Sequence, residues 1–121
     1  MEAQPITQAQ PISQAWMDEM AVRRPALVAR MFAVFLEEEP KRLADVRAAL
    51  IQGDAERLRF LVHSLKGAAA ALGAERLRDC CLALELAAKS GDLSAAPQRL
   101  TELEAEMERV FAFMRAHQAA A

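Results

Sequence analysis

Residues 55–73 read AERLRFLVHSLKGAAAALG, and their spacing predicts one amphipathic helix. Asp54 precedes the run as a candidate N-cap, and Gly73 ends it. At about 100° of rotation per residue, the apolar positions gather within about 60° of one direction. These positions are Leu58, Leu61, Val62, Leu65, Ala69 and Leu72. We expect this stripe to face the core of the protein.

His63 points away from that stripe. It falls about 140° from Leu58, with Lys66 near 80° and Gly67 near 180°. A helical histidine is often a hydrogen-bonded core or rim residue, and a helical lysine is usually a solvated surface residue. The position of His63 on the polar face favours an accessible imidazole instead, and Lys66, three residues further on, can reach the same space.

Gly67 and the alanines after it favour a docking role for this face. A glycine inside a helix costs about 1 kcal/mol relative to alanine, yet it stands here in an alanine-rich segment. The missing Cβ would let the backbone of another protein approach the imidazole. We expect the docking surface to include Phe60, Ser64 and Ala70, with Leu82 from the next helix. For Phe60, an ordinary place at the edge of the bundle is an equal alternative.

The next predicted helix, residues 74–90, carries a second outward stripe of Arg78, Leu82, Glu85 and Lys89. An antiparallel neighbour could bring this stripe beside His63. Glu85 could then accept a hydrogen bond from one imidazole nitrogen and leave the other free to react. Lys89 would add positive charge. The alternative is an ordinary charged helix face, which we favour for Arg78.

The rest of the chain continues the helical pattern. Hydrophobic residues make up 54% of the 121 residues, only 4 Gly and 5 Pro interrupt them, and no segment alternates with period two. We predict an all-α fold, an antiparallel up-down four-helix bundle with a short additional N-terminal helix. Its helices should cover 13–20, 25–51, 55–72 and 74–90, with a fifth after 94 and a kink or short break at Pro40. Residues 1–11 and 117–121 should be tails of one domain, 12–116.

Composition and charge bound the function. The net charge of −2 makes nucleic acid an unexpected main partner, and no apolar run is long enough to cross a membrane. The polar N-terminus lacks the apolar core of a secretion signal. Cys80 and Cys81 are adjacent, and neighbours in a helix point in directions too different to form a disulfide with each other. We expect both to be reduced core residues. We therefore expect a cytoplasmic protein, and a monomer, because one bundle satisfies its own core.

The run from His63 to Gly73, HSLKGAAAALG, resembles the motif of the histidine-containing phosphotransfer (HPt) domain of two-component phosphorelays. The following AERL at 74–77, with Cys81 and Glu85, resembles the next helix of that family. Upstream, FLEEEP at 35–40 and LIQGD at 50–54 also match family segments. The resemblance covers roughly 12–116. The starting Met1 and the short tails favour a free-standing protein over a piece of a larger kinase, and both alternatives stay open.

The resemblance implies a phosphocarrier, with no autokinase activity of its own. The phosphorylated histidine falls on His63, the supporting lysine on Lys66 and the space-making glycine on Gly67. Glu85 and Lys89 stand where the family often has a glutamine and a basic residue. The partners implied are receiver domains of response regulators or hybrid sensor histidine kinases. The receiver would supply the Mg²⁺, so the chain needs no cofactor or metal of its own.

Two other classes of protein stay open. A non-catalytic helical adaptor would use the alanine-rich patch for docking, and His63 would be an exposed surface residue without a chemical role. A helix-bundle metal protein is a third reading, but the chain lacks Glu-x-x-His pairs, and His117 falls in the predicted C-terminal tail.

Overall fold

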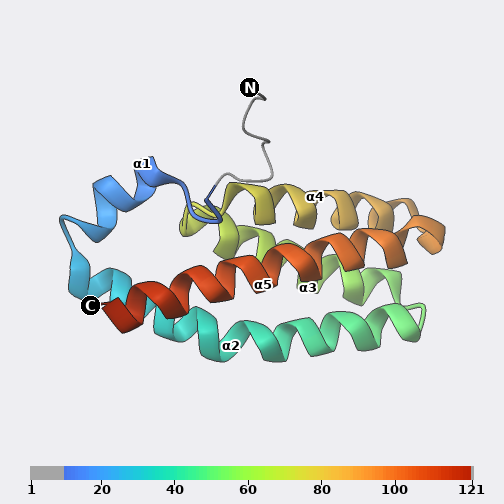
Figure 1. The fold of residues 1–121 in the computed structure, drawn as a ribbon. Coiled ribbons are helices and arrows are strands. Elements are labelled where there is room, and N and C mark those ends of the chain that lie inside the picture. The colour runs from blue at the N-terminus through green and yellow to red at the C-terminus, as the bar shows by residue number, and fades with distance from the viewer. Residues whose placement is uncertain (1–9, 121) are drawn as a thin grey trace, which may run out of the picture.

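The computed structural model describes residues 10–120. Within that range there is no strand, and four long helices lie side by side (Figure 1). They are α2 (Pro25–Ile51), α3 (Ala55–Ala71), α4 (Glu75–Ser90) and α5 (Ala96–Ala120). A short α1 (Gln14–Trp16) and a π-helical turn (Met17–Ala21) lie at one end of the bundle. The predicted all-α bundle with a short N-terminal helix is confirmed.

Polar caps begin the helices where the sequence places them. The side chain of Ser13 accepts a hydrogen bond from the backbone N–H of Trp16 at 3.0 Å. Asp54 accepts one from the N–H of Arg57 at 3.1 Å, at the start of α3. Both bonds satisfy donors that a helix start leaves without a partner. The register of α3, and therefore the direction of His63, is fixed from this cap.

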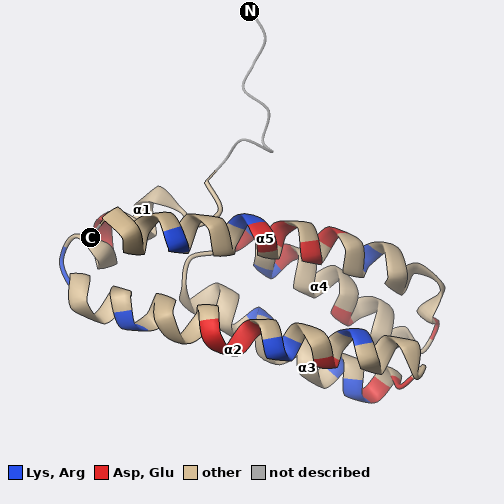
Figure 2. Ribbon diagram, turned by 60° about the horizontal axis from the view of Figure 1, so that its bottom comes forward, with Lys and Arg blue, Asp and Glu red and all other residues tan. Residues whose placement is uncertain are grey.

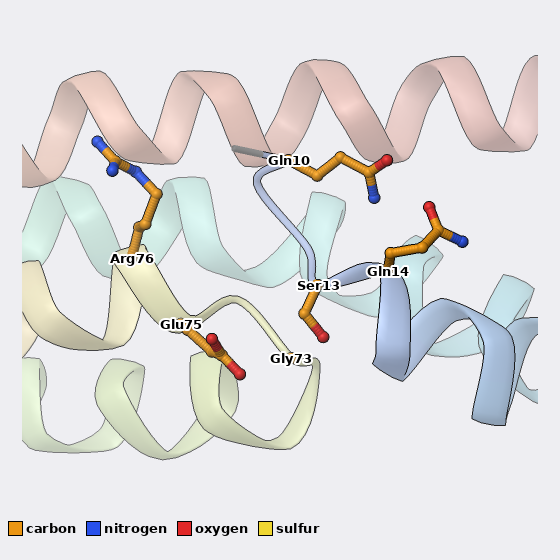
Figure 3. A pocket seen from close by; sticks show the side chains of 6 residues that line it. All are labelled: Gln10, Ser13, Gln14, Gly73, Glu75 and Arg76. Carbon is orange, nitrogen blue, oxygen red and sulfur yellow. The ribbon is translucent and has the colours of Figure 1, made fainter. Parts of the chain in front are cut away.

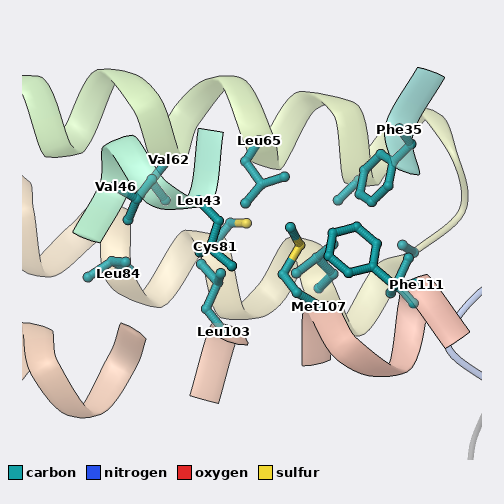
Figure 4. Close-up of a cluster of buried hydrophobic side chains, with 14 of the residues drawn as sticks. Phe35, Leu43, Val46, Val62, Leu65, Cys81, Leu84, Leu103, Met107 and Phe111 are labelled. Carbon is teal, nitrogen blue, oxygen red and sulfur yellow. The ribbon is translucent and has the colours of Figure 1, made fainter. Parts of the chain in front are cut away.

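The core lies between the four long helices (Figure 4). The stripe expected on α3 faces it, with Leu58, Val62, Leu65 and Ala69 fully buried. Leu61, which we expected with them, is only half-buried and packs against the cluster. The facing helices contribute Leu84 from α4 and Leu103, Met107 and Phe111 from α5. Burial of each large side chain contributes about 1.5–3 kcal/mol, so α3 is held rigidly.

The N-terminal segment is fastened to the turn between α3 and α4. The N–H of Ser13 donates to the carbonyl of Gly73 at 2.9 Å, and Trp16 Nε1 donates to the carbonyl of Ala71 at 3.1 Å. Gly73 has φ 71°, and a Cβ there would lie 2.5 Å from Cγ of Trp16. Only glycine fits both the backbone and the packing. Figure 3 shows Ser13 and Gln14 across a hollow from Gly73 and Glu75.

A break at Pro40 and a non-helical C-terminal tail, both expected from the sequence, are not observed. Pro40 does not break α2, which runs continuously from Pro25 to Ile51. Burial of Phe35 and Leu43 on either side of Pro40 holds both halves to the core and offsets the proline's cost of about 3 kcal/mol. The predicted C-terminal tail is also helical, since α5 continues to Ala120.

Tertiary contacts explain the longer α5. The ring of His117 packs edge-on against Phe32, with centroids 5.3 Å apart, and Gln118 Nε2 donates to the carbonyl of Ala29 at 2.8 Å. Of the predicted N-terminal tail, residues 1–9 lie outside the described part, and Gln10 and Pro11 are not helical.

Charges of both signs occur along α2, α3 and α5 (Figure 2). Among residues 10–120, no helix combines the length and the apolar character needed to cross a membrane.

One buried carboxylate on α2 stands apart from the site described below. Glu39 is 5% exposed, and Arg42 Nε lies 3.4 Å from its Oε1. Burial raises the pKa of the Glu39 carboxyl, and the charge of Arg42 offsets this only in part. Between the ordinary carboxyl pKa and this raised pKa, the folded protein binds the Glu39 proton more tightly than the unfolded chain does. The contribution of Glu39 to the free energy of unfolding therefore falls as pH rises through this range.

Glu39→Gln should therefore stabilise the protein at pH 7, by about 1 kcal/mol, because it removes a buried charge with incomplete pairing. The gain should shrink toward pH 4, where the wild-type carboxyl becomes protonated. Urea unfolding at both pH values measures this. Glu37→Gln, at an exposed position two residues away, is the matched control. A loss of stability at pH 7 in Glu39→Gln would contradict the prediction.

Candidate functional site

The imidazole of His63 stands on the outer face of α3. Its side chain is 63% exposed, while Val62 and Leu65 beside it are fully buried. The cap at Asp54 and the buried stripe set this direction. The imidazole is therefore accessible to another macromolecule, and the packing of α3 fixes the direction in which it points.

Glu85 of α4 holds one nitrogen of that ring. The Nδ1 of His63 lies 2.7 Å from Oε2 of Glu85. An ionised carboxylate can only accept, so Nδ1 carries the proton and donates it. In the neutral ring, Nε2 is then the nitrogen with a free lone pair. The hydrogen bond that the sequence suggested for Glu85 is present in the structure.

The sequence predicts Glu85 on an outward face, but Glu85 is buried between α3 and α4 at 8% exposure. Its other oxygen, Oε1, pairs with Lys66 Nζ at 2.6 Å. Burial alone would raise the pKa of the Glu85 carboxyl, but hydrogen bonds from Lys66 and His63 outweigh it and hold that pKa below its ordinary value. Glu85 thus stays ionised at neutral pH and loses these partners only when pH falls below the ordinary carboxyl range.

A surface hollow of about 270 Å³ opens beside the imidazole. It is lined by His63, Lys66, Gly67 and Ala70 of α3, and by Arg78 and Leu82 of α4. A Cβ added at Gly67 would meet nothing within 4 Å, so the chain's own packing does not require glycine there. The hollow therefore brings together the imidazole of His63, the cationic side chains Lys66 and Arg78, and the small residues Gly67 and Ala70.

The structure does not bring every predicted site residue to this hollow. Lys89 is exposed in the last turn of α4 and is not part of its lining. Phe60 is 66% exposed and lines a different hollow at the start of α3, near Arg57. Ser64 is half-buried on the side of α3 away from Ala70.

Arg78 is the lining residue that sequence reasoning missed. The helical pattern predicts an ordinary charged surface residue at this position, yet Arg78 lines the hollow together with His63. Its place in the outward stripe with Leu82 was the available signal. That signal could not be used without the packing of α4 on α3.

Among residues 10–120, no group of three or more His, Cys, Asp or Glu side chains is placed to hold a metal ion. The thiols do not form a reactive centre here either. Burial raises the pKa of Cys81 to about 12, and burial also raises the pKa of the half-buried Cys80.

The chain also matches a model of a known protein family. A family model described as the Hpt domain matches residues 30–113, which include the whole of α3 and α4. The chain belongs to the Hpt domain family. Members of this family carry phosphoryl groups on histidine in phosphorelays, as carriers rather than catalysts, and interact with receiver or kinase components of two-component systems.

The fold of this Hpt domain protein also matches a solved structure. It is similar to the crystal structure of histidine-containing phosphotransfer protein B (HptB) from Pseudomonas aeruginosa PAO1. The TM-score is 0.87 at 26% sequence identity, and the match covers 94% of this chain and 99% of that chain. A comparison with curated protein sequences finds no match.

Proposed function

We propose that this Hpt domain protein accepts a phosphoryl group on Nε2 of His63 from the aspartate of a receiver domain, and passes it to the aspartate of another receiver. The observation that carries the proposal is the pairing of His63 with Glu85. It leaves a 63% exposed ring whose Nδ1 is occupied by a buried carboxylate and whose Nε2 is free.

The transfer step follows from this arrangement. The Nε2 lone pair attacks phosphorus, the Nε2–P bond forms, and the bond from phosphorus to the aspartyl oxygen breaks, with the electron pair leaving on the carboxylate. The ring, which keeps its Nδ1 proton, becomes positively charged. The ionised Glu85 at 2.7 Å stabilises that charge without moving. The reverse step at a second receiver restores the neutral ring.

The position of Glu85 supports the proposal in a second way. A carboxylate close to the phosphoryl group would repel it, but Glu85 contacts the Nδ1 side of the ring and lies buried beneath it. We propose that any Mg²⁺ comes with the receiver, since the carboxylate nearest His63 is already paired with both His63 and Lys66. The free cysteines suit a reducing compartment, and we propose the cytoplasm.

Lys66 is proposed to support the transferred group from this side. Lys66→Ala removes a cation that lines the hollow and leaves Glu85 with one partner fewer. Transfer from a phosphorylated receiver should slow about ten-fold, or the phosphohistidine lifetime should shorten by a similar factor, equivalent to about 1.4 kcal/mol. Quench-flow transfer and a decay assay measure the two.

Lys89→Ala makes the same charge change outside the hollow and is the matched control. Equal effects of the two variants on rate and lifetime would show that only overall charge matters, and would contradict the role given to Lys66.

The alternative of a non-catalytic adaptor is separated from the carrier by one assay. A phosphorylated receiver is incubated with the protein, and the label is tested for acid lability and base stability. A carrier gains such a label, and an adaptor binds the receiver without gaining it.

A further inference from the structure

The wall of the hollow opposite His63 contains a cation that the site described so far does not use. Arg78 reaches this wall from the first turns of α4, and Leu82 follows one turn later. His63, Lys66 and Gly67 form the α3 side. A group bonded to the imidazole inside this hollow would therefore share the hollow with Arg78.

The charges around His63 favour a second cation in the hollow. The positive charge of Lys66 is matched by the negative charge of Glu85, at 2.6 Å. A phosphoryl group brings a charge of about −1.5 to −2 at neutral pH. The phosphorylated ring adds a second positive charge, so Lys66, the ring and Glu85 together supply about one positive charge against the phosphoryl oxygens. A second cation within the hollow would offset the remaining negative charge of the phosphoryl group.

The present partner of Arg78 holds it weakly. Its Nη2 lies 3.0 Å from Oδ1 of Asp79, its neighbour in the chain, and the two side chains are 48% and 66% exposed. Exposed pairs of this kind contribute little to stability. A guanidinium forms two parallel hydrogen bonds to phosphate oxygens, which are stronger and better oriented. Exchange of Asp79 for a phosphoryl group is therefore favourable.

We propose that Arg78 is a phosphoryl-binding residue, which turns from Asp79 to the oxygens of the group on Nε2 of His63. The inference rests on the proposed function, since it takes His63 as the acceptor. It assigns to this chain a second cation on the α4 side of the phosphoryl group, opposite Lys66.

The test uses the whole protein without any receiver. Phosphoramidate phosphorylates imidazole directly: the Nε2–P bond forms, the bond from phosphorus to the ammonia nitrogen breaks, and ammonia leaves. The phosphohistidine signal is followed by ³¹P NMR as pH is changed, and its absence in His63→Gln identifies it. A cation against the oxygens favours the more charged form of the group. Arg78→Ala should therefore raise the pH midpoint of the phosphoryl titration by about one unit.

Two variants sharpen the result. Arg78→Lys keeps the charge but not the fork, and its midpoint should lie between those of wild type and Arg78→Ala. Arg57→Ala removes an exposed arginine that lines a different hollow of α3, and should leave the midpoint unchanged. A midpoint in Arg78→Ala equal to that of wild type overturns the role of Arg78 and leaves the acceptor role of His63 intact. Failure of His63 to take the label in the wild type overturns both.

Discussion

Replacing His63 with glutamine should abolish phosphorylation of this protein by a phosphorylated receiver. Glutamine has no nitrogen with a nucleophilic lone pair, so no N–P bond can form. Its amide N–H can still donate to Glu85, and the His63 side chain is 63% exposed, so stability should change by no more than about 0.5 kcal/mol. The measurement is the acid-labile, base-stable label after mixing with the receiver, beside circular dichroism of the variant.

The second histidine supplies the matched control. His117 is half-buried and packs edge-on against Phe32 near the end of α5. His117→Gln should keep the full label, although it loses a ring contact. Equal labelling of wild type and His63→Gln would rule out His63 as the acceptor and would favour the non-catalytic adaptor as the function of the protein.

Replacing Gly67 with glutamine should slow transfer from a receiver on the order of 100-fold, the effect expected when reacting groups are held about 1 Å too far apart. Gly67 lies one turn after His63 and borders the same hollow. A side chain there meets nothing within the protein, so it would extend toward the partner. The small donor phosphoramidate should react much more nearly at the wild-type rate, because the obstacle acts only on a macromolecule.

Controls separate this steric effect from a folding effect. Gly67→Ala should stabilise the protein by about 1 kcal/mol, since alanine is the better helix former, and raise its Tm by about 4 °C. Ala44→Gln places the same side chain on the exposed face of α2 and should transfer normally. Receiver transfer at the wild-type rate in Gly67→Gln would refute the account of docking over this glycine.

Much of this architecture is predictable from the sequence because the helices are regular. The period of 3.6 residues separates Leu58 and Val62 from His63, and the structure buries the first two and exposes the third. The caps at Ser13 and Asp54 follow from local hydrogen bonding. Local rules therefore predicted correctly that His63 lies on the exposed face of α3.

What the sequence could not supply is the relation between helices. A helical wheel gives the angle of Glu85 on α4 but not the fact that α3 covers it, so Glu85 was predicted outward and is buried. The same gap hid Arg78 in the wall of the hollow. The helical end of α5 depends on contacts of His117 and Gln118 with α2, which lie about ninety residues away in the chain. Local propensity does not contain such contacts.

The identity of the phosphorylated nitrogen tests the central claim most directly. The protein is labelled with ¹⁵N at histidine, phosphorylated by a receiver, and its long-range ¹H–¹⁵N and ³¹P–¹⁵N couplings are recorded. Because Glu85 holds Nδ1 of the ring, the phosphorus should couple to Nε2 of His63, while Nδ1 keeps its proton. Phosphorus bonded to Nδ1, or to any residue other than His63, would contradict the account.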